Sequence, residues 1–179
     1  VEGIQNPVDL AHGVLLYSPH IFLAADGARI FAEKQNIPLI KSVDPDKEKA
    51  RSASCDTVGA VAFDGTIFAA ALSSGGLEDG AIGRVGDVPL PGCGLFCGPA
   101  GAVACTGDGE FIARIVLAKE VYGWLETNMR SREAAQKAMD LLDDAVDFGI
   151  VVLSRTEFAS KARHGMAWAN VTEAENVWH

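Results

Sequence analysis

The stretch TVGAVAFDGTIFAAALSS, residues 57–74, decides the fold class of this chain. Two runs rich in apolar residues flank the dipeptide Asp64-Gly65, and such a dipeptide between such runs is a strong local signal for a β-hairpin. The segment directly before it, SVDPDKEKARSASCD at 42–56, is charged and contains a proline, so it predicts an exposed or disordered linker. A strand that begins at Thr57 therefore follows a stretch that is suited to be cut.

The rest of the chain predicts further helices and strands around this hairpin. Helices are expected at 6–18, 26–36, 110–126 and 131–146, and strands at 19–24, 100–107, 148–155 and 164–171. Asn6 is a candidate N-cap before Pro7, and Ser131 begins a helix that resembles a capping box without its glutamate. The grouping of helices and strands favours an α+β layered fold, and 179 residues are expected to form one domain.

Composition excludes several classes of partner. The net charge is −9, which argues against binding nucleic acid or an anionic membrane surface, because both need a basic face. No run has the length of a transmembrane span, and no signal-like segment opens the sequence, so we expect a cytoplasmic protein. The cysteines form no CxxC pair and no zinc spacing with His164 or His179, so we expect free thiols, no metal and no cofactor: Cys55, Cys93, Cys97 and Cys105.

Thr57 is the first candidate for chemistry. A threonine hydroxyl is a poor nucleophile until a base removes its proton. Its own α-amine, with an ordinary pKa of roughly 7.7 to 8, would serve once the bond between Asp56 and Thr57 is cleaved. Taken alone, the residue is also an ordinary strand former, so this role depends on the motifs that follow.

Two glycine-rich motifs add candidate binding groups. In GRVGD, residues 83–87, the Arg84 guanidinium suits a carboxylate and Asp87 offers a counter-charge for an ammonium, so the pair could hold both ends of an amino acid. In CTGDGE, residues 105–110, the Thr106 hydroxyl and backbone N–H groups at a strand-to-helix junction could form an oxyanion hole. A surface ion pair and a simple capped turn are the alternative interpretations of the two motifs.

The order TVGAVAFD, SSGG, GRVGD and TGDGE resembles the plant-type (type 2) L-asparaginase and isoaspartyl peptidase family of N-terminal nucleophile hydrolases. The upstream segment IQNPVDLAHGVLLYSPHIFLAADGARIFAEKQNI is similar to the end of the family's α subunit, and HGMAWAN is similar to its closing strand. The resemblance implies a four-layer αββα sandwich. It also implies autocleavage into an α part, 1–56, and a β part, 57–179, assembled as a homodimer of αβ units.

The resemblance also implies a role for each motif residue. Thr57 would be both nucleophile and base, and Ser74 would stand where the family has a second threonine beside the nucleophile. The substrate would be L-asparagine or a β-aspartyl peptide, hydrolysed through an acyl-enzyme that water resolves to aspartate. The residues that would bind it are Arg84 for the α-carboxylate, Asp87 with Gly107 and Gly109 for the α-ammonium, and Thr106 with Gly107 for the oxyanion.

Other functions of the same family remain as alternatives. SSGG and GCG are similar to the protein-cleaving relative, threonine aspartase, whereas Asp87 suits a free α-amine that an internal peptide site lacks. A glycosylasparaginase is a third possibility. The family's N-terminal region, with the first strands of the sandwich, is expected to be missing before Val1, and Ser74 replaces a threonine. The non-enzymatic alternative is therefore an inactive homologue that serves as a binding or structural subunit.

Overall fold

The computed structural model of the chain describes residues 1, 3–40, 56–77, 80–172 and 176–178. They divide into two compact units, Val1–Asp56 with Ser73–Arg84, and Thr57–Leu72 with Val85–His179. Each unit has an apolar core of its own.

The first unit is built on two helices, α1 at Pro7–Tyr17 and α2 at Ala25–Lys34. Both were predicted, and Pro7 does begin α1, although the Asn6 side chain makes no capping hydrogen bond. The predicted strand at 19–24 is wrong, because these residues are an irregular connection between the two helices. Within the part of the chain that the structure describes, no strand pairs with 19–24, so the apolar run alone was not enough to make a strand.

The core of this unit is formed by small and branched residues rather than by the large ones. On α2, Ala28 and Ala32 are buried, whereas Ile30 is 45% exposed and Phe31 only packs against the core from its edge. Alanine lets α2 approach α1 closely, and Leu10 and Val14 of α1 fill the contact. Ile30 therefore lies outside this core, whereas its neighbour Phe31 packs against it.

The second unit contains a four-stranded antiparallel sheet in the order β3-β4-β5-β6. The strands are β3 at Leu95–Gly98, β4 at Gly101–Gly107, β5 at Phe148–Leu153 and β6 at Phe158–Ala162. The sequence predicted β4 and β5 but not the two edge strands. β3 is only four residues long and β6 carries Ser160 and Lys161, so neither shows a clear apolar alternation.

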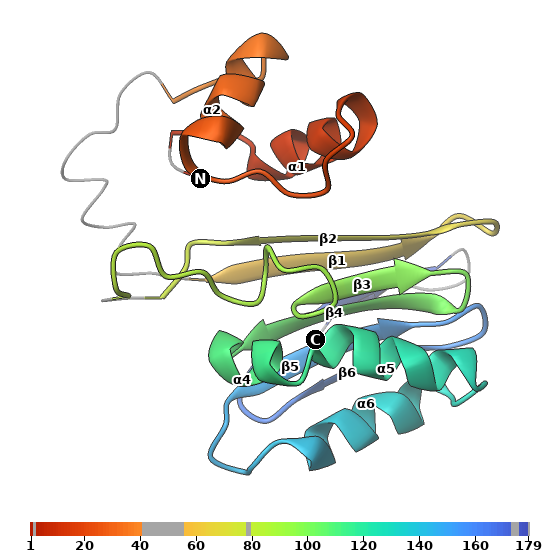
Figure 1. Cartoon of the computed structure of the whole chain (residues 1–179). Helices are drawn as coiled ribbons and strands as arrows, with labels where there is room; N and C mark the ends of the chain where they lie inside the picture. The colour runs from red at the N-terminus through yellow and green to blue at the C-terminus, as the bar shows by residue number, and fades with distance from the viewer. Residues whose placement is uncertain (2, 41–55, 78–79, 173–175, 179) are drawn as a thin grey trace. The chain divides into compact units, whose positions relative to one another are not determined.

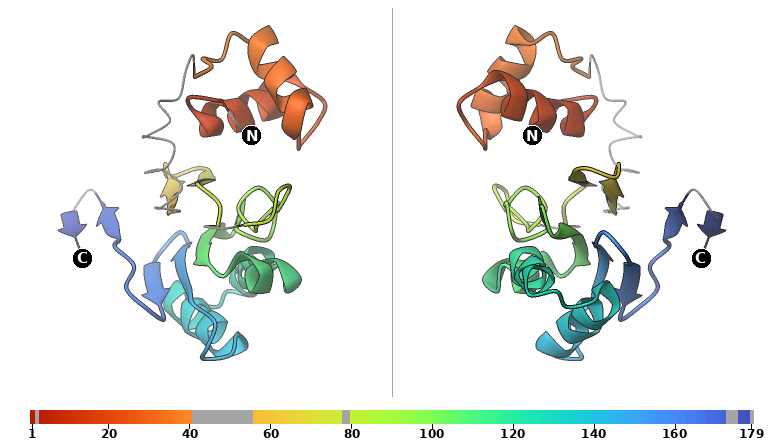
Figure 2. Two further views of the ribbon diagram at one scale, coloured as in Figure 1. Left: turned by 90° about the vertical axis from the view of Figure 1, so that its left-hand side faces the viewer. Right: turned by 90° about the vertical axis from the view of Figure 1, so that its right-hand side faces the viewer.

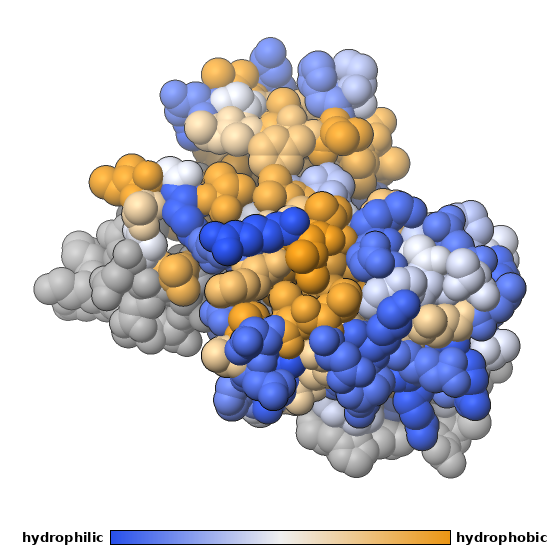
Figure 3. Space-filling model, turned by 60° about the horizontal axis from the view of Figure 1, so that its bottom comes forward, coloured by the Kyte–Doolittle hydropathy of each residue, from blue (hydrophilic) through white to orange (hydrophobic). Residues whose placement is uncertain are grey.

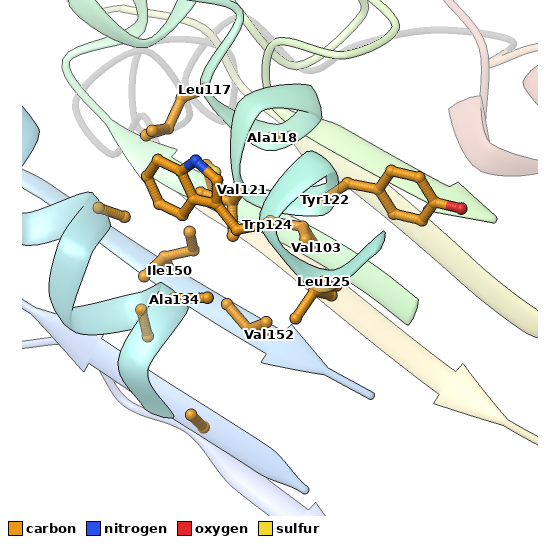
Figure 4. Packing of buried hydrophobic residues seen from close by; sticks show 14 of the residues in the cluster. Val103, Leu117, Ala118, Val121, Tyr122, Trp124, Leu125, Ala134, Ile150 and Val152 are labelled. Atoms are coloured by element: carbon orange, nitrogen blue, oxygen red, sulfur yellow. The ribbon is translucent and has the colours of Figure 1, made fainter. Parts of the chain in front are cut away.

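Helices cover one face of this sheet, as Figures 1 and 2 show. Helix α5, Leu117–Glu126, packs on β3 and β4, and α6, Ser131–Leu141, packs on β5 and β6. Figure 4 shows the buried contact, in which Val121, Trp124 and Leu125 of α5 meet Val103, Ile150 and Val152 of the sheet. The outer faces of α5 and α6 carry exposed charged residues. Figure 3 shows hydrophilic residues beside a central apolar area on one side of the molecule.

The predicted helix at 110–126 is in fact two helices. α4 spans Gly109–Arg114, and Val116 then adopts a left-handed conformation with φ 52° before α5 begins. The break lets the Lys119 N–H reach the carbonyl of Gly92 and the Ala118 N–H reach that of Cys93. These contacts with a distant loop have no local signature, since a β-branched valine is an unusual residue for φ > 0.

The opposite face of the sheet carries the predicted hairpin, β1 at Thr57–Phe63 and β2 at Phe68–Ser74. The turn lies where it was expected, and the Asp64 carboxylate accepts the N–H groups of Thr66 and Ile67 at 2.7 and 2.8 Å. Strand β1 packs on β4 and β5. Gly59 makes this approach close, because a Cβ there would lie 3.6 Å from that of Ala104 and would collide with Leu72.

These elements make a mixed helix and sheet protein, as the α+β prediction requires.

A small third sheet pairs β7, Ala169–Val171, with β8, Asn176–Trp178. Strand β7 ends at the residue where the predicted last strand ends. Within the second unit a helix layer, the four-stranded sheet and the strand β1 are stacked. The full four-layer arrangement would involve both units and stays a prediction. Among the described residues, no helix has the length and apolar character needed to cross a membrane.

Candidate active site

Thr57 is the first residue of β1 and lies half-buried on the face of this strand that meets the sheet. The alternation of β1 decides this, because Val58, Ala60 and Ala62 are exposed whereas Thr57, Val61 and Phe63 are half-buried. On the same face, a Cβ on Gly59 would lie 3.6 Å from that of Ala104. Thr57 is two residues from Gly59 and shares its face. Its side chain is therefore directed into the layer between β1 and β4.

Thr106 lies on the facing surface of the sheet. In β4, Val103 and Cys105 belong to the helix-side core, so Ala104 and Thr106 face β1. Figure 1 shows β1 beginning at the end of the sheet where β4 ends, next to α4. The structure thus places the predicted nucleophile and the predicted oxyanion donor on facing strands at the same end of the unit.

The turn after Thr106 is held by a reciprocal pair of hydrogen bonds. Gly107 has φ 126°, which only glycine adopts readily, and a side chain there would collide with the backbone of Asp147 and Phe148. The Asp108 N–H donates to the Asp147 carbonyl at 2.8 Å, and the Asp147 N–H donates to the Asp108 carboxylate at 3.0 Å. Gly109 follows as the first residue of α4. The backbone of Gly107 and Gly109 is therefore fixed at the strand-to-helix junction, as an oxyanion hole requires.

Asp87 is a buried residue, only 6% exposed. Hydrogen bonds of one glycine, Gly94, connect its backbone to the end of β4. The Gly94 N–H donates to the Asp87 carbonyl at 3.1 Å, and the Gly94 carbonyl accepts the Cys105 N–H at 2.7 Å. A Cβ on Gly94 would lie 2.9 Å from the Asp87 carboxylate, so the bare glycine makes room for it. A buried charge this close to the end of β4 is suited to a cationic group of a ligand.

The same carboxylate affects two neighbouring thiols. Burial raises the pKa of Cys93 and of Cys105, and the negative charge of Asp87 raises each pKa further. Both thiols therefore stay protonated near neutral pH and are poor nucleophiles. Cys93, Cys97 and Cys105 are free cysteines, as predicted, whereas Cys55 lies outside the described residues.

The remaining predicted residues belong to the first unit. Ser74 ends β2, and its hydroxyl accepts the Gly76 N–H at 3.1 Å. Arg84 is half-buried in an irregular stretch, where its N–H donates to the Ala81 carbonyl at 2.9 Å. The Asp56 carbonyl, which belongs to the bond expected to be cut, accepts the Gly75 N–H at 3.1 Å. The predicted linker at 42–56 lies, apart from Asp56, outside the described residues.

Sequence reasoning missed residues that shape this end of the sheet. Asp147 pairs with the turn at Asp108 and also lies 2.9 Å from the ring of His164. Gly149, the second residue of β5, is the register partner of Thr106. A glycine so early in an otherwise bulky strand was the one available signal, because such a glycine often marks a close approach of another group.

Comparisons with known proteins agree with these motifs. A family model described as asparaginase matches residues 39–178. An isoaspartyl peptidase/L-asparaginase of Mus musculus is 36% identical over 96% of this chain and 60% of its own length, and one of Danio rerio is 34% identical over 94% and 62%. A plant-type L-asparaginase of Pyrococcus horikoshii is 30% identical over 79% of this chain and 55% of its own length. The chain thus spans about 60% of the length of the curated relatives it matches.

Proposed function

Because the chain belongs to the asparaginase family whose model matches residues 39–178, we propose that it is the catalytic part of a threonine-dependent amidohydrolase. The substrate is L-asparagine or a β-aspartyl peptide, as the names of its relatives suggest. The observation that carries the proposal is the shared layer between β1 and β4, into which Thr57 and Thr106 are directed at one end of the sheet.

The first step is cleavage of the chain before Thr57. The Thr57 hydroxyl attacks the Asp56 carbonyl, and the C–N bond breaks to give an ester and the free α-amine of Thr57. Water then hydrolyses the ester, which releases the Asp56 carboxylate and restores the Thr57 hydroxyl. The Gly75 N–H already donates to this carbonyl at 3.1 Å, so a hydrogen-bond donor is in place where negative charge develops. This contact supports the assignment of the cleaved bond.

Turnover then uses the liberated amine as the base. The α-amine takes the proton of the Thr57 hydroxyl, whose oxygen attacks the side-chain amide of the substrate. The Thr106 hydroxyl and the Gly107 N–H stabilise the oxyanion. The protonated α-amine of Thr57 then gives its proton to the leaving nitrogen, the C–N bond breaks, and ammonia, an amino acid or a peptide is released. Water then attacks the ester on Thr57, and aspartate leaves.

Substrate binding uses the two charged residues of the GRVGD motif. Arg84 binds the α-carboxylate with its planar fork, and Asp87 binds the α-ammonium together with backbone carbonyls at Gly107 and Gly109. The burial of Asp87 supports this role, because a desolvated carboxylate gains most from a cationic partner. Ser74 would contact the nucleophile with its hydroxyl. The functional unit would be a homodimer of αβ units.

Mass spectrometry of the protein after incubation tests the proposal. We expect a fragment that begins at Thr57 in the unaltered chain and none in the Thr57→Ala variant, with aspartate released from asparagine or from β-aspartyl-leucine. The control is Thr66→Ala in the β1–β2 turn. This variant changes neither residue of the Asp56–Thr57 bond, so we expect it to be cleaved like the unaltered chain. A chain that stays whole under all conditions would contradict autocleavage, and cleavage without aspartate release would favour an endopeptidase.

A further inference from the structure

Met166 lies over Gly149, next to the predicted oxyanion donor Thr106. Gly149 lies opposite Thr106 in the β4–β5 register, and a Cβ on Gly149 would lie 3.3 Å from the Thr106 Cγ2 methyl and 2.5 Å from the Met166 sulfur. The Thr106 methyl and the Met166 sulfur therefore lie within about 6 Å of each other, on either side of the space that glycine leaves open.

This space is on the face of the sheet that carries β1. Phe148 and Ile150 of β5 belong to the helix-side core, so Gly149 between them faces the opposite way, like Thr106. Both Thr106 and Met166 are half-buried. The thioether and the threonine methyl thus border the same space, at the layer where the proposed chemistry takes place.

The segment that carries Met166 is anchored on both sides of it. Before it, the Arg163 N–H donates to the Phe148 carbonyl at 3.0 Å, and the His164 ring lies 2.9 Å from the Asp147 carboxylate. After it, the Trp168 ring packs on Phe158 with centroids 5.4 Å apart. Met166 is therefore held over β5 by its neighbours and does not depend on its own packing alone.

This arrangement favours one side-chain conformation of Thr106. A threonine carries a methyl and a hydroxyl on Cβ, and the three staggered χ1 rotamers exchange their positions. With the methyl directed to Gly149 and Met166, the hydroxyl has to occupy another staggered position. A rotation that brought the hydroxyl to the thioether would replace an apolar contact by a poor hydrogen bond, since a thioether sulfur is a weak acceptor.

We propose that Met166, acting across the bare Gly149, is a positioning residue that holds Thr106 in one rotamer and so keeps its hydroxyl aimed for oxyanion stabilisation. The choice of rotamer rests on the geometry around Gly149, and only its effect on catalysis rests on the proposed function.

The rotamer is measured without reference to activity. Three-bond couplings from the backbone carbonyl carbon and nitrogen to the Thr106 methyl carbon, in uniformly labelled protein, report χ1. We expect values of a single rotamer in the unaltered protein and averaged values in Met166→Ala. Single-rotamer couplings in Met166→Ala would overturn the proposal.

Kinetics then test the catalytic consequence. We expect Met166→Ala to lower kcat about tenfold at unchanged KM, since a misaimed oxyanion donor is felt in the transition state. In a Thr106→Ser background, which keeps the hydroxyl but has no methyl to hold, Met166→Ala should change kcat by less than about twofold. Equal losses in both backgrounds would contradict action through Thr106.

Met129→Ala is the matched control. This methionine is half-buried against the helix-side core, so the variant loses the same side chain without reaching Thr106, and its kcat should stay unchanged. If the unaltered protein shows neither cleavage nor turnover, the proposed function fails, while the couplings still decide whether Met166 holds the rotamer.

Discussion

Arg84 and Asp87 show how one short motif can supply two opposite charges in different settings. Asp87 is buried beside Gly94, whereas Arg84 is half-buried in an irregular stretch of the other unit. An arginine suits the carboxylate of a free amino acid because its fork donates two parallel hydrogen bonds. A lysine carries the same charge but donates from one point, so replacing one by the other isolates the geometric part of the interaction.

Arg84→Lys is therefore expected to raise KM for asparagine about tenfold, the effect of losing roughly 1.4 kcal/mol of binding, with a smaller change in kcat. Steady-state kinetics over a range of asparagine concentrations measure both constants. The control is Arg29→Lys, an exposed arginine of α2 that pairs with Glu33 and should leave KM unchanged. An unchanged KM in Arg84→Lys would contradict its assignment as the carboxylate-binding residue.

Helix α6 shows how a cap can come from a distant element. The sequence pattern suggested Ser131 as the start of a capping box, but the Ser131 hydroxyl donates to the Glu157 carbonyl at 2.8 Å. The cap is instead the Glu157 carboxylate from the β5–β6 turn, which accepts the Arg132 N–H at 3.0 Å. This hydrogen bond, with the nearby Arg130 and Arg132 charges, lowers the pKa of Glu157.

Glu157→Gln is expected to lower the free energy of unfolding by about 1 kcal/mol at pH 7, because the helix loses a charged cap. A group whose folded pKa is lowered stabilises the fold above its unfolded pKa. The difference between the two proteins should therefore be full above pH 4.5 and disappear as the pH falls through the lowered pKa of Glu157.

Urea denaturation of both proteins between pH 3 and 7 measures this difference. Glu126→Gln removes a carboxylate that pairs with Lys119 at 3.4 Å on the exposed side of α5, and serves as the control with a loss below about 0.5 kcal/mol. A difference for Glu157→Gln that does not change with pH would show that the cap acts without its charge.

For the molecule as a whole, the hairpin has to stay packed on the sheet if the site is to hold together. The end of the hairpin away from Thr57 is anchored by Arg155 of the β5–β6 turn. Its guanidinium lies 5.2 and 5.9 Å from the ring centroids of Phe63 and Phe68, which stack on each other at 4.2 Å. A cation over two rings links the two sheets through side chains alone.

Arg155→Gln is expected to destabilise the protein by about 1 kcal/mol through the loss of this contact. Hydrogen exchange should locate the change, with faster exchange in β1 and β2 than in the helix-covered sheet. Arg132→Gln on the exposed side of α6 is the control, since its ion pair with Glu157 is 4.0 Å long. Equal exchange of the hairpin in both variants would argue against this anchor.

Much of this architecture could be predicted because the signals were local. The hairpin, α1, α2, α6, β4 and β5 are encoded by apolar periodicity, a turn dipeptide and a helix-initiating proline. The edge strands β3 and β6 were missed because their pairing partner, not their own pattern, makes them strands. The break at Val116 was missed for a related reason, since hydrogen bonds to the loop at 92–93 stabilise it.

By itself the sequence determined the mixed fold class and the family, because apolar periodicity and short glycine-containing motifs act over a few residues and survive in any context. Only the tertiary structure decided that Thr57 and Thr106 face the same layer, that Glu157 caps α6 and that Met166 lies over Gly149. These contacts join residues that are far apart along the chain. They follow from strand register and sheet packing, which no local pattern specifies.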